Sequence, residues 1–363
     1  MSNDTQPEIR FPGFTEAWEQ RKLGEVVESV GTGRSTFTNG IVQTSETPYA
    51  VLGSTSVISY DSMFDHSGDF ILTARVGANA GNLYKYFGEV KISDNTVYIQ
   101  ANNLDFIYYL LTKYDLKRLS FGTGQPLVKA SEVKNLKLNF PQKNEEQQKI
   151  GSFFKQLDDT IALHQRKLDL LKETKKGFLQ KMFPKNGAKV PEIRFSGFTG
   201  DWEDREFSEI VKTTGYKAYL SEAFEVGEYP VIQQGDKPIL GYSDKKPFEN
   251  FEDVVLFGDH TLSLYKPETP FLVATDGLKI ITVPNFSGSF LLSLLEKYVP
   301  ESQGYKRHFT ILKKEQVAFP TDVKERVLIG EFFTQIDRTI TLHERELDLL
   351  KETKKGFLQK MFV

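Results

Sequence analysis

Cysteine is absent from this sequence, and so are long apolar runs. The missing cysteine excludes a disulfide scaffold, a thiolate metal site and a cysteine nucleophile. The densest apolar stretch, Phe290 to Leu295, is interrupted by Ser293 and is far shorter than the ~20 residues that a membrane-spanning helix needs. The initial MSNDTQPEIR has no apolar core of the kind found in secretion signals. We therefore expect a cytoplasmic protein.

An excess of positive charge is also missing. Lys and Arg number 46 against 49 Asp and Glu, which gives a net charge of −3. Proteins that coat nucleic acid through charge alone are usually basic, so a general coating role is disfavoured. The 363 residues suggest two or three domains, because a domain usually has about 100–200 residues. Any nucleic-acid binding must use individually placed residues or the charge of a partner.

The motifs of common catalytic sites are missing as well. The sequence has no GxxxxGK[ST] phosphate loop, no HExxH metal motif and no GxSxG nucleophile turn. We interpret residues 121–124, Phe-Gly-Thr-Gly, as a tight turn rather than a cofactor loop. Asp276 and Lys279 have the spacing of some nuclease sites, but no second acidic residue precedes them on a matching strand. We predict a chain that is not catalytic and binds no metal or cofactor.

The sequence does contain an internal duplication. Residues 7–27, PEIRFPGFTEAWEQRKLGEVV, return as 191–211, PEIRFSGFTGDWEDREFSEIV. Residues 151–183 return as 330–362, and only seven of these 33 positions differ. The blocks between the repeats share almost no alignable identity. The sequence thus predicts two similar frames that hold two different inserts.

Each long repeated segment has the period of a helix with one apolar seam. Steps of four and three residues from Ile150, and likewise from Ile329, meet apolar side chains at eight of ten positions, as in a coiled coil. We expect the two helices to pair antiparallel, which places the inserts at opposite ends; a parallel pair is the alternative. The predicted seam residues are Ile150, Phe154, Leu157, Ile161, His164, Leu168, Leu171, Phe178, Ile329, Phe333, Ile336, Ile340, His343, Leu347, Leu350 and Phe357.

Polar residues occupy matching places in the two segments. His164 and His343 share one seam position, where histidine either sets the register or serves as a metal or pH-sensitive site; we favour register. The lysines either approach a phosphate backbone or form a solvated face, and we favour the solvated face. These are Lys175, Lys176, Lys181 and their counterparts Lys354, Lys355 and Lys360.

The inserts have the pattern of mixed α/β domains. Each contains several short strand-like runs and one late helix, which favours an α+β fold over a βαβ repeat. In the first insert we expect strands at 48–53, 69–77, 91–99 and 136–140 and a helix at 104–119. In the second we expect strands at 229–234, 253–257, 271–275 and 279–283 and a helix at 289–298.

Polar loops rich in glycine, amides, cations and aromatic residues adjoin the predicted strand ends. Arg and Lys can bind guanine edges, Gln and Asn can bind adenine edges, and hydroxyls and amides can bind phosphates. Ordinary surface loops have a similar composition. Our candidates for DNA contact are Arg34, Arg75, Tyr84, Lys85 and Gln125 in the first insert, and Lys217, Gln233, Gln234, His260, Lys266, Lys306 and Arg307 in the second.

The whole arrangement resembles the specificity subunit of type I restriction–modification systems. The residues that carry the resemblance are the two starts with FPGFTEAW and FSGFTGDW, the segments FPQKNEEQQKIGSFF (140–154) and FPTDVKERVLIGEFF (319–333), and the endings LDLLKETKKGFLQKMF. The loops VIQQGD, LFGDHT and ATDGLK are also similar to pieces of that family. One departure is that Gln148 of the first frame is replaced by Val327 in the second.

The resemblance implies two target recognition domains, each reading one half of a bipartite asymmetric duplex site, and two long spacer helices. It implies residues 1–141 and 186–320 as the recognition domains, with spacer helices at 142–185 and 321–363. It also implies two methyltransferase subunits that use S-adenosylmethionine and two restriction subunits that use ATP and Mg²⁺. Two alternatives are a coiled-coil scaffold whose α/β domains bind proteins or glycans, and a DNA-modifying enzyme in its own right.

Overall fold

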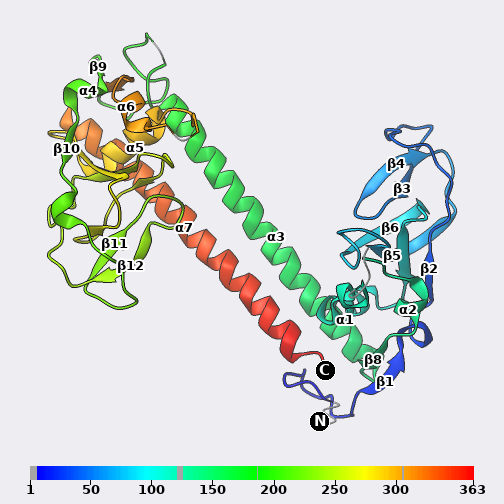
Figure 1. The fold of residues 1–363 in the computed structure, drawn as a ribbon. Helices are drawn as coiled ribbons and strands as arrows, with labels where there is room; N and C mark the ends of the chain where they lie inside the picture. Colours follow the sequence, from blue (N-terminus) through cyan, green and yellow to red (C-terminus); the bar gives the residue numbers. More distant parts are fainter. Residues whose placement is uncertain (1–5, 121–125, 186, 305) are drawn as a thin grey trace. The chain divides into compact units, whose positions relative to one another are not determined.

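The computed structural model of the protein describes residues 6–120, 126–185, 187–304 and 306–363. It divides into two compact units (Figure 1): unit 1 comprises residues 1–164 and 346–363, and unit 2 comprises residues 165–345. Each unit therefore contains one insert, part of the long helix α3 (Asn144–Lys181) and part of the long helix α7 (Val323–Lys360).

The main sheet of unit 1 has six strands in the order β2–β7–β5–β6–β3–β4. All neighbours are antiparallel except β3 and β6, which are parallel. In β5, Phe70 and Leu72 pack into one apolar cluster and Ile71 into another, because side chains alternate between the two faces of a strand. The strands are β2 Ser29–Thr32, β3 Tyr49–Leu52, β4 Val57–Asp61, β5 His66–Ala74, β6 Leu83–Ile92 and β7 Thr96–Gln100.

The helix α1 (Leu104–Tyr114) covers the face of the sheet on which Ile71 lies, and its buried residues include Phe106 and Leu110. It is followed by Asp115, whose φ of 62° lies in the left-handed region. Two further strands, β1 (Glu19–Lys22) and β8 (Lys137–Phe140), pair antiparallel. Short helices complete the unit: η1 Leu23–Glu25, η2 Leu116–Ser120 and α2 Ala130–Lys134.

Within unit 1, the first part of α3 packs antiparallel against the last part of α7. The rings of Phe153 and Phe357 have centroids 5.1 Å apart, and Lys354 pairs with Asp158 at 2.5 Å. After α7 ends, Phe362 is buried with its ring 6.2 Å from that of Trp18. The apolar end of one helix is thus part of the core at the start of the other.

Unit 2 has smaller sheets, in the orders β10–β16–β13–β14, β12–β11–β15 and β17–β9. Among the paired strands described in this unit, β11 and β15 run parallel and the other neighbours run antiparallel. The strands are β9 Glu203–Glu206, β10 Lys212–Thr214, β11 Tyr229–Ile232, β12 Ile239–Ser243, β13 Val255–Gly258, β14 Leu264–Tyr265, β15 Leu272–Val273, β16 Leu278–Thr282 and β17 Gln316–Phe319. The helices are α4 Phe207–Ile210, η3 Lys217–Tyr219, α5 Gly288–Tyr298 and α6 His308–Leu312.

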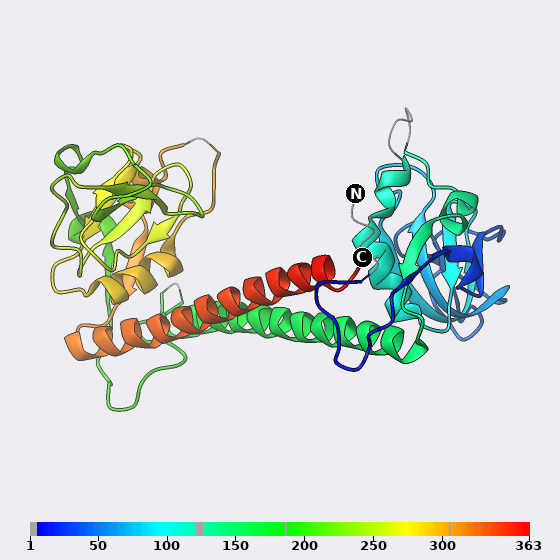
Figure 2. The same cartoon turned by 90° about the horizontal axis from the view of Figure 1, so that it is seen from below.

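The helix pair of unit 2 repeats the pairing seen in unit 1. The rings of Phe178 and Phe332 lie 5.0 Å apart, and Lys175 pairs with Asp337 at 2.6 Å. The helix α5 lies along the first turns of α7 (Figure 2), and a Cβ at Gly330 would lie 2.6 Å from the backbone nitrogen of Phe290. Glycine at this position therefore permits the close approach of the two helices.

The structure confirms the α+β class and the antiparallel pairing of the long helices, which rules out the parallel alternative. Two expected elements are wrong. The run 91–99 is not one strand, because β6 ends at Ile92 and β7 begins at Thr96, where Thr96 N–H donates to Ser93 across a turn. The helix expected at 104–119 ends five residues early, at Tyr114. None of the described helices is long and apolar enough to span a membrane.

Candidate nucleic-acid interface

In unit 2, several loops meet at Asp259, whose exposed fraction is only 3%. Its Oδ1 accepts a hydrogen bond from the backbone N–H of Phe309 (2.9 Å), and its carbonyl oxygen accepts one from His308 N–H (3.0 Å). Its own N–H donates to the carbonyl of Gly277 (2.8 Å). The Lys279 ammonium lies 3.8 Å from Oδ2 and offsets the buried charge. Asp259 therefore joins the loop after β13, the turn before β16 and the start of α6.

The loop that follows β11 joins the same cluster through Gln234. The side-chain oxygen of Gln234 accepts a hydrogen bond from the N–H of His260 (3.3 Å). A Cβ at Gly277 would lie 2.7 Å from Gln234 Nε2, so glycine lets the two loops approach. Gly235 N–H also donates to Ser263 Oγ (2.9 Å). The structure thus brings together two of the predicted DNA-contact residues, Gln234 and His260.

A buried histidine completes this cluster. His308 Nε2 accepts a hydrogen bond from Gln303 N–H (3.0 Å), and its Nδ1 donates to the carbonyl of Asp259 (3.0 Å). Lys306 in turn donates from Nζ to Gln303 Oε1 (3.0 Å). Sequence reasoning missed Asp259 and His308 as site residues. The polar loops LFGDHT and SQGYKRHFT contain Asp259 and His308, but their composition does not indicate which of their side chains are buried.

Unit 1 builds the same loop framework around Arg75. Its N–H donates to the carbonyl of Asn95 (2.8 Å), and its carbonyl accepts from Val128 N–H (2.8 Å). These are the counterparts of the two backbone hydrogen bonds that Asp259 makes in unit 2. The Arg75 residue is exposed, whereas Asp259 is buried. One backbone position therefore carries an accessible cation in unit 1 and an enclosed carboxylate in unit 2.

The structure places six of the twelve predicted contact residues at exposed positions. The exposed residues are Arg34, Arg75, Lys217, His260, Lys306 and Arg307. The half-buried residues are Tyr84, Lys85, Gln233, Gln234 and Lys266. Gln125 lies outside the described residues.

The predicted loop location is wrong for Tyr84 and Lys85, which lie within the strand β6. Lys85 Nζ pairs with Asp105 (2.6 Å) and lies 4.8 Å from the centre of the Tyr108 ring. The Tyr84 hydroxyl donates to the carbonyl of Gly53, and burial raises the pKa of this hydroxyl. The strand was missed because LYKYFGEVKI alternates aromatic and charged residues with few fully buried positions.

The arginine of each PEIRF segment forms a buried ion pair. In unit 1 the guanidinium of Arg10 donates two hydrogen bonds to the Glu146 carboxylate (2.6 and 2.8 Å). In unit 2 Arg194 makes the same pair with Glu325 (2.7 and 2.8 Å). Both carboxylates are 1% exposed, and these hydrogen bonds raise the pKa of each arginine. Each pair ties the start of a frame to the first turn of a long helix.

All predicted seam residues are buried or half-buried. The buried ones are Ile150, Phe154, Leu168, Ile329, Phe333, Ile340, His343 and Leu347. The half-buried ones are Leu157, Ile161, His164, Leu171, Phe178, Ile336, Leu350 and Phe357. In unit 1, His164 Nδ1 lies 3.6 Å from the Glu346 carboxylate.

The interpretation of the shared lysines as a solvated face is wrong for two of them. Lys354 pairs with Asp158 and lies 5.3 Å from the centre of the Tyr109 ring. Lys175 pairs with both Asp337 (2.6 Å) and Glu296 (2.7 Å). The other four shared lysines are exposed. Lys175 and Lys354 therefore stabilise the helix pairs instead of facing solvent.

Comparison with known proteins identifies the repeated plan. The family described as "Type I restriction modification DNA specificity domain" matches the chain twice, over residues 15–173 and 199–352. Among curated proteins, the EcoprrI specificity subunit of Escherichia coli is 23% identical over 128 residues, 34% of this chain and 32% of the relative. The MjaVIII specificity subunit of Methanocaldococcus jannaschii is 27% identical over 158 residues, 41% and 36% of the two chains. The matched regions span about a third of these relatives' lengths.

Solved structures share the fold. The S subunit of a type I restriction–modification system from M. genitalium covers 99% of both chains with a TM-score of 0.74 and 16% identity. A chain from a structure on complex assembly and conformational transition of the type I R-M system covers 98% of this chain and 99% of its own, with a TM-score of 0.51 and 18% identity. With both of its repeats matched, the chain belongs to the family of type I restriction–modification DNA specificity domains.

Proposed function

We propose that this chain is the DNA sequence-specificity subunit of a type I restriction–modification complex and reads a bipartite, asymmetric duplex target. Residues 1–141 and 186–320 act as the two target recognition domains, one for each half-site. The helices within 142–185 and 321–363 act as spacers. The chain itself performs no catalysis and works in the cytoplasm.

The observation that carries this proposal is the shared loop framework with different side chains. Arg75 and Asp259 occupy equivalent backbone positions. The Arg75 residue is exposed, whereas the Asp259 carboxylate is buried and accepts a hydrogen bond from a neighbouring loop. Base recognition depends on the donors, acceptors and charges that a loop presents. Two domains of one fold with different loop chemistry are therefore suited to two unrelated half-sites.

Exposed leucines on the long helices support docking of two identical subunits. In unit 1, Leu163 and Leu349 are 63% and 69% exposed, and in unit 2, Leu170 and Leu342 are 67% and 56% exposed. All four occupy the same heptad position of their helices. We propose that the repeated frames bind two methyltransferase subunits, which use S-adenosylmethionine, and that two restriction subunits using ATP and Mg²⁺ join them.

Methylation mapping tests the proposal. The chain is expressed with its cognate methyltransferase subunit in a host without other methylation systems, and the genome is sequenced with detection of methylated bases. We expect one methylated motif of two different short half-sites separated by a gap of fixed length. Methylation by the chain alone would favour the enzyme alternative. A partner methyltransferase that shows no methylation with this chain, together with no retention on duplex DNA, would favour the scaffold alternative.

Helix length tests the spacer role. Inserting one heptad into α3 and one at the facing position of α7 adds about 10 Å to each helix, or roughly three base pairs of duplex. We expect a wider gap with the same bases read on either side. An insertion into α3 alone is the control, because it shifts the seam out of register. A gap that does not respond to matched insertions would contradict the spacer role.

A further inference from the structure

We propose that His308 is a positioning residue for DNA contact by unit 2: its imidazole holds Gln303, and Gln303 holds the Lys306 ammonium where it can bind a phosphate of the duplex. The inference rests on the proposed function, because it gives Lys306 a role in reading the second half-site.

The imidazole of His308 is fully buried, and each ring nitrogen has a backbone partner. Nε2 lies 3.0 Å from the N–H nitrogen of Gln303, and Nδ1 lies 3.0 Å from the carbonyl oxygen of Asp259. An amide N–H can only donate and a carbonyl oxygen can only accept. The ring proton is therefore on Nδ1, and Nε2 is the acceptor that holds Gln303.

Packing alone does not require an imidazole at this position. The equivalent residue of unit 1 is Val128, whose N–H donates to the Arg75 carbonyl as the His308 N–H donates to the Asp259 carbonyl. Both side chains are fully buried, so an apolar residue fills the equivalent place in the same loop framework. A buried polar ring is unfavourable unless its nitrogens are hydrogen-bonded. What histidine adds in unit 2 is an acceptor for the segment that precedes α6.

The bond from His308 to Gln303 also fixes a cation. The side-chain oxygen of Gln303 accepts a hydrogen bond from Lys306 Nζ (3.0 Å). Gly304 has a φ of 74°, in the left-handed region that glycine adopts readily, and this lets the chain turn next to Gln303. Lys306 is exposed, and an ammonium has three donors. It can therefore bind a phosphate oxygen while Gln303 still holds it.

The chemistry of this group favours a phosphate over a base edge as its ligand. An ammonium is a compact point charge, whereas base edges are recognised by paired donors and acceptors. Arg307, the next residue, is also exposed and positive. The negative charge of Asp259 beneath them is offset by Lys279, whose ammonium lies 3.8 Å from the carboxylate. The segment thus offers positive charge to the DNA backbone.

Substitutions that separate the two ring nitrogens test the inference in the full chain, assembled with its cognate methyltransferase subunit. His308→Asn keeps a donor near the Nδ1 position but has no acceptor at the Nε2 position. We expect it to weaken DNA binding by about fivefold, the value of one hydrogen bond. His308→Gln places its side-chain oxygen near the Nε2 position and should restore most of the affinity. Fluorescence anisotropy over a range of salt concentrations measures binding to the target and to unrelated duplexes.

The loss should be the same on every sequence, because a phosphate contact carries no base information. Lys306→Ala should weaken binding to a similar extent and reduce the slope of log K against log salt by about 0.9. Adding His308→Asn to Lys306→Ala should cause less than about a twofold further loss, since both changes remove one contact.

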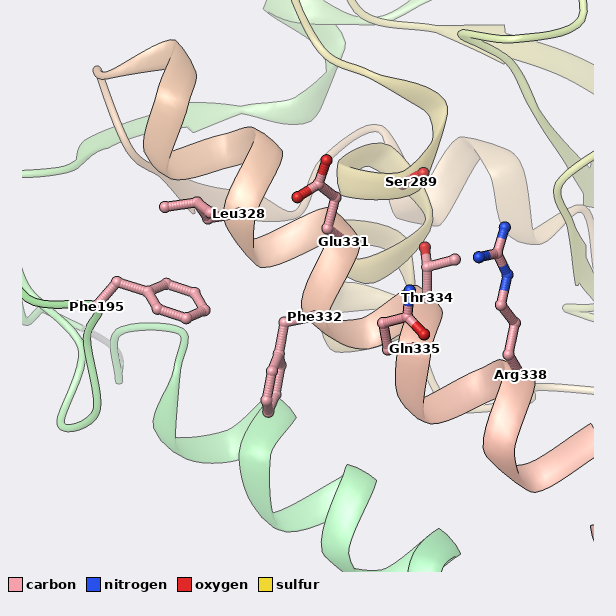
Figure 3. A pocket seen from close by; sticks show the side chains of 8 residues that line it. All are labelled: Phe195, Ser289, Leu328, Glu331, Phe332, Thr334, Gln335 and Arg338. Atoms are coloured by element: carbon pink, nitrogen blue, oxygen red, sulfur yellow. The ribbon is translucent and has the colours of Figure 1, made fainter.

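Two control variants separate positioning from charge and from stability. Arg338→Ala removes an exposed cation of unit 2 from α7, one turn after Thr334 (Figure 3), and should leave the affinity and the salt slope unchanged. Val317→Ala truncates a buried residue of β17 and should lower the stability of unit 2 in denaturant unfolding without changing DNA affinity.

The outcomes separate the inference from the function on which it rests. Full affinity in His308→Asn, an equal loss in His308→Gln, or additive losses of the His308 and Lys306 variants would overturn the inference. A loss confined to particular bases would also overturn it, because the segment would then read sequence. If the unaltered complex shows no preference for its target duplex, the proposed function itself is wrong.

Discussion

Units 1 and 2 use one loop framework for different chemistry. In both units, the residue that directly follows a central strand, β5 in unit 1 and β13 in unit 2, donates its N–H to one loop and accepts a hydrogen bond at its carbonyl from another. This residue is Arg75 in unit 1 and Asp259 in unit 2. The backbone hydrogen bonds are equivalent because main-chain donors and acceptors do not depend on the side chain. The framework can therefore stay the same while the side chains that it presents are exchanged.

The helix pairs show a second difference of the same kind. The shared lysine of unit 1, Lys354, pairs with Asp158, which also accepts a hydrogen bond from the Tyr109 hydroxyl (2.7 Å). The shared lysine of unit 2, Lys175, pairs with Asp337 and with Glu296 of α5. The repeated Lys–Asp pair is retained, and the helix of each insert adds its own third group. Each cluster thus combines two side chains of the repeated frame with one side chain of the insert.

The largest effect is expected from exchanging a whole insert. Replacing residues 28–139 by the corresponding block of another family member should change one half-site and leave the other intact. Each mismatched base pair typically costs about 1–3 kcal/mol, so loss of three or four pairs weakens binding to the original target by at least about a hundredfold. Methylated-base sequencing measures the outcome, and exchange of residues 212–318 is the matched experiment for the other half-site. Simultaneous change of both half-sites would show that recognition is not modular.

The next-largest effect is expected from breaking the buried arginine–glutamate pair of either frame, which should cost the two units similar stability. Arg10→Leu leaves the buried Glu146 carboxylate without its partner and should destabilise unit 1 by about 3–5 kcal/mol. Arg194→Leu should destabilise unit 2 by a similar amount, because Glu325 is equally buried. Hydrogen exchange followed through denaturant assigns the loss to one unit. The double variant Arg10→Leu with Glu146→Leu should recover most of the stability, and a failure to recover it would mean that the arginine acts through packing.

The long helices and their pairing could be predicted from the sequence, because both follow from regular spacings of residues. Heptad spacing identifies the seam, and a 179-residue repeat suggests that the helices pair with each other. The sequence could not show that Phe362 packs against Trp18, since those residues are far apart in the chain. Arg10 and Glu146 are 136 positions apart, so neither residue indicates the other.

The candidate site was less predictable for a physical reason. The DNA contacts stay a prediction from polar, glycine-bearing loops, and the structure places six of the predicted residues at exposed positions. The role of Asp259 depends on the backbone N–H of Phe309, 50 positions later, and a backbone donor has no sequence signature. Lys85 looked accessible but is held by Asp105 and Tyr108, which lie on α1. Only the fold brings these groups together.

The third prediction compares the two residues at the equivalent loop position. Arg75→Ala should weaken DNA binding by about 1–3 kcal/mol and relax specificity at one base pair of the first half-site, provided the guanidinium contacts a base. Asp259→Ala should instead destabilise unit 2 by about 1–3 kcal/mol, because Phe309 N–H loses a buried acceptor. Fluorescence anisotropy of the assembled complex on duplexes altered in either half-site, together with denaturant unfolding, separates the two effects. If the Arg75 variant lost stability as the Asp259 variant does, the two residues would not differ in role as predicted.

The smallest effect is a pH dependence confined to unit 2. Burial raises the pKa of Glu296 above its ordinary value of 4.5, although Lys175 opposes the shift. A carboxyl group with a raised pKa binds its proton more tightly in the folded state, so its contribution to the stability of unit 2 falls as the pH rises from below 4.5 through the raised pKa. Glu296→Gln mimics the protonated form and leaves Lys175 paired with Asp337.

The stability difference between the Glu296→Gln variant and the unaltered protein should therefore be near zero at low pH and favour the variant at neutral pH, by less than about 1 kcal/mol because Lys175 compensates part of the charge. Denaturant unfolding of both proteins between pH 4 and pH 8 measures this difference. The other titratable groups are the same in both proteins, so their contributions cancel. Unit 1 has Thr112 at the corresponding position of α1, so hydrogen exchange in unit 1 should be identical in the two proteins. An advantage of the variant that grows toward acid would reverse the sign, and would mean that the ion pair with Lys175 outweighs the cost of burying Glu296.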